Sequence, residues 1–277
     1  MININLWRAE SLKTFKRPAN LIMVIFIPLL GFFYYGAIFF NALAYGGQYL
    51  TDAQATLPFP KSFEVVVGTV AGFAKLMAVV FIANNVGSEY NQDTWKMILP
   101  RHGNRIAFLI TKLFSALIAM IIFVVSAIGC WLLFAWLGAL ALNINAALPT
   151  PSTLIMAQLK LVVLSIMDMV FYGILAFMAT VITRSVVGGI LFGLIALFGL
   201  EILGQMATNN VALMLPSVHM NNIDARWLMN PRLIRMITSQ LGQDVPIKAS
   251  LLVLSGYISL FISATFYLFR RRDMAGS

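Results

Sequence analysis

Long apolar runs alternate with short polar segments along the whole chain. A helix needs roughly 20 apolar residues to cross roughly 30 Å of hydrocarbon, and six runs reach about that length. Each run is continuous rather than alternating, which favours helices over the strands of a barrel. The pattern therefore predicts an all-α integral membrane protein with six transmembrane helices, at residues 21–44, 65–86, 106–142, 156–183, 186–205 and 251–269.

The first 19 residues predict an amphipathic helix that precedes the first span. One side carries Ile4, Trp7, Leu12 and Phe15, and the other carries Glu10, Lys13, Lys16 and Arg17. We expect this helix to lie along the headgroups of the membrane, with Pro18 at the turn into the first span. An ordinary basic flank is the alternative interpretation.

Three polar segments separate spans on the side opposite the termini. Residues 45–63 and 143–153 contain glycines or prolines and predict loops. Residues 206–247 form the longest segment outside the spans and contain apolar runs too short to cross a membrane. We expect interfacial or re-entrant helices there, broken at Pro216 and Pro231.

Composition supports the membrane interpretation, because 60% of the 277 residues are hydrophobic and only 10% are charged. Lys and Arg near the spans set orientation, and about twelve of them fall on the side of the termini against about five on the other. The protein is therefore expected in the inner membrane of a bacterial or archaeal cell, with both termini in the cytoplasm. The net charge of +9 follows from this topology, and no basic soluble face indicates nucleic-acid binding.

Catalytic and nucleotide-binding motifs are missing from the sequence. It contains no Walker phosphate loop, no Gly-rich dinucleotide fingerprint and no zinc-type histidine spacing. We expect no enzymatic activity and no cofactor in this chain, so any ATP must be bound and hydrolysed by another chain. The whole chain reads as a single transmembrane domain, residues 1–277.

The polar segment after the second span, residues 87–105, carries the most specific pattern. An acidic residue is followed five positions later by Thr, then by a Gly, an Arg and finally a Lys at the start of the next span. On charge alone, a solvated turn with positive-inside residues explains it. The residues that carry the pattern are Glu89, Thr94, Trp95, Lys96, Leu99, Arg101, Gly103, Arg105 and Lys112.

This pattern resembles the permease subunits of type 2 ABC exporters, the ABC-2 family. The family often has Gly before the Thr, whereas this chain has Asp93. The resemblance covers essentially the whole chain, because the N-terminal helix, the six spans, Leu215-Pro216-Ser217 and the basic end at residues 269–273 also agree with it.

The resemblance implies a half-transporter. Two copies of this subunit, or one copy and a similar permease, would sit on two cytoplasmic ATPase subunits that bind ATP and Mg²⁺. The segment after the second span would form a coupling helix against the ATPase, and the N-terminal helix would be a connecting helix that makes a second contact. The residues implied in the coupling contact are Glu89, Asp93, Thr94, Trp95, Lys96, Arg101 and Arg105.

Three of the ionisable residues within the expected spans are candidates for a functional role. Lys75 and Asp168 lie near the middle of the second and fourth spans, where an unpaired charge costs at least about 2.5–3.5 kcal/mol. They are expected either to form a structural ion pair or to be a polar patch on the substrate path. Glu201, near the outer end of the fifth span, is expected to face an external vestibule or to reach the interface.

Two other classes of function remain open from the sequence. An ion-gradient-driven secondary transporter would use Lys75 and Asp168 as a proton relay, but predicts internal repeats that are not convincing here. A membrane-embedded enzyme would need clustered acid, base or metal ligands at one membrane face. The favoured hypothesis is the permease subunit, and no residue selects its substrate.

Overall fold

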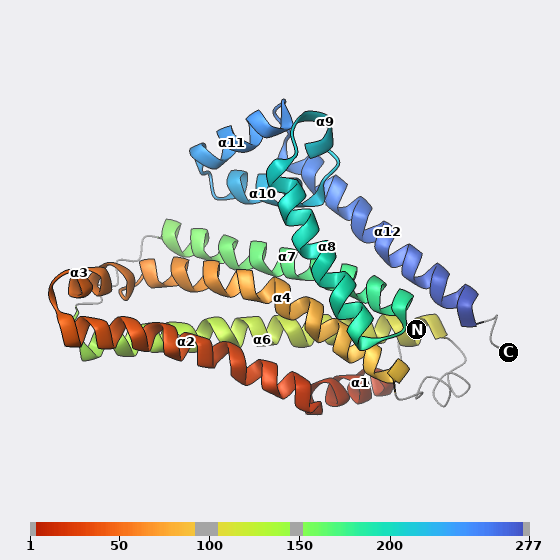
Figure 1. Ribbon diagram of the computed structural model, residues 1–277, viewed down its shortest axis with the longest axis horizontal. Helices are drawn as coiled ribbons and strands as arrows, with labels where there is room; N and C mark the ends of the chain where they lie inside the picture. The colour runs from red at the N-terminus through yellow and green to blue at the C-terminus, as the bar shows by residue number, and fades with distance from the viewer. Residues whose placement is uncertain (1–3, 92–104, 145–151, 274–277) are drawn as a thin grey trace. The chain divides into compact units, whose positions relative to one another are not determined.

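A computed structural model describes residues 4–91, 105–144 and 152–273, which are helical with short connections and contain no strand (Figure 1). The helices are α1 (Ile4–Lys16), α2 (Pro18–Tyr45), α3 (Gly47–Thr56), α4 (Lys61–Asn91), α6 (Arg105–Ala141), α7 (Ser152–Thr183), α8 (Val186–Met206), α9 (Asn209–Ala212), α10 (Pro216–Trp227), α11 (Pro231–Leu241) and α12 (Ile247–Asp273).

The prediction of six membrane-spanning helices is confirmed by length and apolar character. The six candidate spans are Pro18–Tyr45, Lys61–Tyr90, Ile106–Ala141, Gln158–Thr183, Val186–Met206 and Ile247–Arg271. Large apolar side chains such as Phe33 on α2 and Ile195 on α8 are more than half exposed. Exposed apolar faces of this kind on long helices are suited to contact with lipid rather than water.

The connecting segments contain more helix than the sequence predicts. The prediction of a loop at residues 45–63 is wrong over α3, a ten-residue helix whose polar sequence carries no span-like signal. The prediction of helices between residues 206 and 247 is confirmed, and α10 and α11 begin at Pro216 and Pro231. Proline suits the first position of a helix because the amide it lacks would have no partner there.

The chain divides into two compact units, and the division falls inside α1, α4, α6 and α7. The first unit comprises residues 1–10, 75–117 and 167–277, and the second comprises residues 11–74 and 118–166. Each unit is described separately.

The second unit contains all of α2 and α3 and the later part of α6. The indole of Trp131 on α6 is buried and donates from Nε1 to the Ile27 carbonyl of α2 at 2.8 Å. Gly31 makes this approach possible, because a Cβ there would lie 2.4 Å from the indole ring. At the corner between α1 and α2, the buried Asn20 side chain donates to the Thr14 carbonyl at 2.7 Å and so caps the end of α1.

The first unit is built around the later part of α7, whose residues 169–181 are almost entirely buried. α8 packs closely on α7 and α4 through small residues. A Cβ on Gly193 would lie 2.6 Å from Val79 of α4, and a Cβ on Gly87 of α4 would lie 2.7 Å from the Val186 backbone. Small residues let helices approach in a membrane, where dispersion contacts rather than the hydrophobic effect hold them together.

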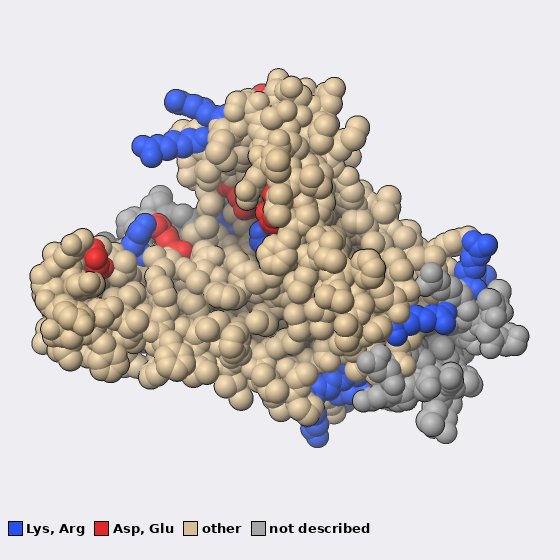
Figure 2. Space-filling model, in the orientation of Figure 1, with Lys and Arg blue, Asp and Glu red and all other residues tan. Residues whose placement is uncertain are grey.

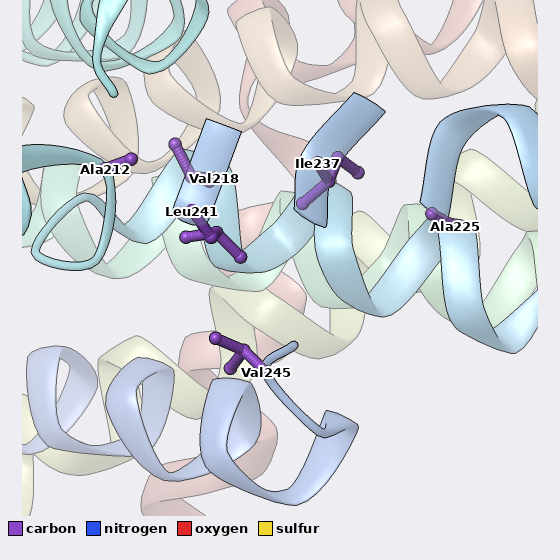
Figure 3. Close-up of a cluster of buried hydrophobic side chains, with 6 residues drawn as sticks. All are labelled: Ala212, Val218, Ala225, Ile237, Leu241 and Val245. Carbon is purple, nitrogen blue, oxygen red and sulfur yellow. The ribbon is translucent and has the colours of Figure 1, made fainter. Parts of the chain in front are cut away.

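Helices α9 to α11 form a compact subdomain of the first unit, packed through α10 on α8 and α12. Its core is a cluster of buried apolar side chains from α9, α10, α11 and the residues before α12 (Figure 3): Ala212, Val218, Ala225, Ile237, Leu241 and Val245. Buried His219 and Asn222 of α10 both hydrogen-bond to Ser250 Oγ of α12, at 3.0 and 2.9 Å. These contacts hold α10 in a fixed position on α12.

Candidate functional site

The first unit contains a cluster of charged side chains centred on Lys75. Its ammonium lies 3.0 Å from Asp168 Oδ2 and 3.1 Å from Glu201 Oε1, so three different helices meet at one cation. The Asp168 side chain is only 8% exposed, and those of Lys75 and Glu201 are 22% and 28% exposed. The structure therefore brings together all three ionisable residues that the sequence singled out within the spans.

The sequence left two interpretations of Lys75 and Asp168 open, a structural ion pair and a polar patch on the substrate path. The two residues do form an ion pair, and Glu201 is a third member of it. Glu201, which the sequence placed at a vestibule or interface, turns inward to Lys75. With two carboxylates against one ammonium, this contact is not neutral.

Two other members of the cluster were not identified from the sequence. The Tyr172 hydroxyl, fully buried on α7, donates to Glu201 Oε1 at 2.9 Å, and Lys75 Nζ lies 5.7 Å from the Tyr172 ring centre. Asp224 of α10 is close enough to interact electrostatically with Asp168, Lys75 and Glu201. Tyr172 follows Asp168 by one helical turn, so both lie on the same face of α7. This spacing is the sequence signal from which Tyr172 could have been identified.

Asp224 has an unusual environment for a carboxyl group. The pKa of Asp224 is raised to about 7, chiefly by burial; the Asp168 and Glu201 carboxylates also raise it, and Lys75 lowers it. Its Oδ1 atom is buried and has no hydrogen-bond partner among the described residues. Desolvation disfavours the charged form of a carboxyl, which explains the direction of the shift.

A cavity of about 650 Å³ opens beside this carboxyl group in the α9–α11 subdomain. Figure 2 shows red acidic atoms recessed in the surface close to where α8 and α10 run, with blue basic atoms beside them. The cavity is lined by Gly204, Gln205, Ala207, Thr208, Asn221, Asp224, Leu233, Met236, Ile237, Ser239 and Gln240. A cavity of this size is typical of small-molecule sites, with one acidic group among neutral polar and apolar walls.

A second buried charge network joins α1, α4 and α6 in the first unit. Lys112 Nζ lies 2.5 Å from Glu89 Oε1 and 3.3 Å from Glu10 Oε2. All three side chains are buried, at 3%, 0% and 8% exposed respectively. Glu10 was expected on the polar side of α1, and its partner on α6 was not foreseen.

The residues predicted to contact an ATPase are only partly described. Asp93, Thr94, Trp95, Lys96 and Arg101 lie outside the described residues. Arg105 is the first residue of α6. Glu89 is fully buried against Lys112, so its side chain does not offer a surface contact.

The described residues contain no group of three or more His, Cys, Asp or Glu arranged to hold a metal ion. In comparison with known proteins, the family described as "Protein of unknown function (DUF2705)" matches residues 21–275. No curated protein matches the chain.

Proposed function

We propose that this chain, which belongs to the DUF2705 family of proteins of unknown function, is the membrane-spanning permease subunit of an ATP-driven ABC-2 type exporter. It forms the substrate path and works with separate cytoplasmic ATPase subunits. Six candidate spans and an N-terminal helix agree with this architecture. In this proposal both termini and the segment between α4 and α6 are cytoplasmic.

The observation that carries the proposal is the buried Glu10–Lys112–Glu89 network. It ties together α1, α4 and α6, the elements that lead into the proposed ATPase contacts. A buried ion pair is costly to break, so the three helices are expected to move together where it joins them. A push on the segment between α4 and α6 is therefore transmitted to two membrane helices and to α1 together.

Transport in this proposal requires no covalent chemistry in the chain itself. ATP binding closes the paired ATPases, which prefer one arrangement of the two membrane subunits over the other. The difference in affinity shifts the population from inward to outward conformations. The second membrane subunit is another copy of this chain or a similar permease.

Charge reversal in the coupling segment tests the proposal. The chain is co-expressed with the ATPase encoded beside it, and Lys96→Glu with Arg101→Glu is compared with wild type for ATPase recovery on affinity purification. We expect recovery to fall severalfold, because charges at an interface set partner recognition. The matched control, Arg232→Glu with Arg235→Glu on exposed positions of α11, is expected to retain the ATPase.

The contacts of Lys75 favour a second candidate, an ion-gradient-driven secondary transporter. Lys75 is paired with the buried Asp168 and the partly exposed Glu201, and ionisable groups at such a position within a span are suited to a proton relay. This candidate predicts substrate uptake into vesicles that contain the purified chain alone, driven by a pH gradient. The exporter proposal predicts no such uptake without the ATPase and ATP.

A further inference from the structure

The charge cluster around Lys75 contains more acid than base. Asp168, Glu201 and Asp224 supply three carboxyl groups, and Lys75 supplies the single ammonium that interacts with all of them. Two of these carboxyl groups, Asp224 in the cavity wall and Asp168 outside it, each have a buried Oδ1 atom with no hydrogen-bond partner among the described residues. A buried carboxylate oxygen without a donor is unfavourable, so the site is built for an additional donor or positive charge.

The cavity beside Asp224 provides room for the group that carries this charge. Asp224 belongs both to the charge cluster and to the cavity wall. The cavity wall also has an apolar part, formed by Leu233, Met236 and Ile237 of α11. A ligand that fits must combine a positively charged head with an apolar body.

We propose that this cavity binds an amphiphilic cation with N–H donors, an amine or a guanidinium, and that such cations are the substrate class of the transporter. The charged head binds the Asp224 carboxylate, and the apolar body packs on α11. The assignment as transported substrate rests on the proposed exporter function. Binding itself requires only this chain.

Protonation of Asp224 competes with the ligand. The charged groups that act on its carboxyl group are Lys75 of α4, Asp168 of α7 and Glu201 of α8. On α10 itself, Arg226 is engaged by Asp244 and by Asn222. Because the pKa of Asp224 is raised by burial to about 7, the ionised form that attracts a cation grows as pH rises through this value. Affinity is therefore expected to increase from pH 6 to pH 8.

The test uses the purified full chain in lipid nanodiscs and monodansylcadaverine, a fluorescent primary amine with an apolar ring system. Binding is followed by fluorescence anisotropy after subtraction of empty nanodiscs. We expect Asp224→Asn to weaken binding by about 10- to 100-fold, the range for loss of a hydrogen bond to a charged group. The matched control Asp244→Asn removes the same charge from a 75% exposed position that does not line the cavity, and is expected to bind normally.

The neutral N-acetyl derivative of the probe tests the need for charge. Equal binding of the two probes, or equal affinity of wild type and Asp224→Asn, would overturn the proposal. Glu201→Gln provides a second variant, because its amide oxygen still accepts from Tyr172 while one acidic charge is lost. At pH 8, where Asp224 is mostly ionised in both proteins, we expect weaker amine binding there too. Since no ATPase is present, failure here leaves the exporter proposal to its own test. Failure of ATPase binding would remove the assignment as exported substrate but not the binding site itself.

Discussion

Replacement of Lys112 by Met tests the role assigned to the buried Glu10–Lys112–Glu89 network. Met keeps much of the length and apolar stem of Lys but removes the ammonium. The change leaves Glu89, which has no exposed surface, and Glu10 without their shared cation. Two carboxylates then remain buried side by side.

The expected cost follows from the two distances. With an effective dielectric constant of about 20, the attractions over 2.5 and 3.3 Å amount to roughly 7 and 5 kcal/mol. Desolvation of the charges offsets much of this, and loss of one partner from a buried pair costs about 3–5 kcal/mol. For a chain of this size, about 2–4 °C per kcal/mol gives a fall in Tm of roughly 6–20 °C.

Thermal stability in detergent, followed by the monodisperse fraction on size-exclusion chromatography, measures this change. Lys61→Met breaks a pair of similar spacing, 2.8 Å from Glu64, but with side chains 61% and 49% exposed. This control should leave Tm unchanged within error. The double variant Glu89→Gln with Lys112→Met should lose at least about 1 kcal/mol less than the sum of the single losses. An unaltered Tm for Lys112→Met, or simple additivity of the two single losses, would show that the Glu10–Lys112–Glu89 network does not stabilise the fold.

Three further predictions address packing and pH. Gly87→Ala should cost about 1–3 kcal/mol through overpacking, whereas Gly72→Ala on the same helix, with open space around it, should be neutral or stabilising in the same thermal assay. Trp131→Phe should cost about 1–3 kcal/mol, because the buried Ile27 carbonyl loses its indole donor; unchanged Tm would contradict this. Burial raises the pKa of Asp224 to about 7, above the value of about 3.9 for an unfolded aspartate. As pH rises between these values, the unfolded chain gives up this proton before the folded chain does, so Tm should fall. Asp224→Asn should flatten that part of the pH profile, and an unchanged slope would argue against the assignment.

Much of the helical framework is predictable from sequence because membrane spans need only local information. Length and continuous apolar character locate all six candidate spans, and Pro216 and Pro231 locate the starts of two connecting helices. α3 escaped prediction because its sequence, Gly47–Thr56, has neither an apolar run nor a strong amphipathic stripe. α3 packs on α2, and we attribute its helical form to this packing rather than to intrinsic helix preference.

The composition of the charge cluster depends on contacts between distant parts of the chain. The pairing of Lys75 with Asp168 was an open alternative in the sequence, because one Lys and one Asp at similar depth make a natural pair. Glu201 joins them across 126 positions, and its rotation about the α8 axis is set by Gly189 and Gly193 packing. Asp224 lies in a segment whose fold depends on the buried core of α9–α11, so sequence spacing could not bring it to the cluster.

In the proposed function, this chain transports only in partnership with a separate ATPase. The most direct measurement is purification of the tagged full chain from native membranes, with subunit stoichiometry by mass spectrometry and ATP turnover in nanodiscs. The account predicts two ATPase subunits for each pair of membrane subunits, with turnover that is lost in the Lys96→Glu with Arg101→Glu variant. A stable, homogeneous assembly that contains no nucleotide-binding subunit and hydrolyses no ATP would contradict it.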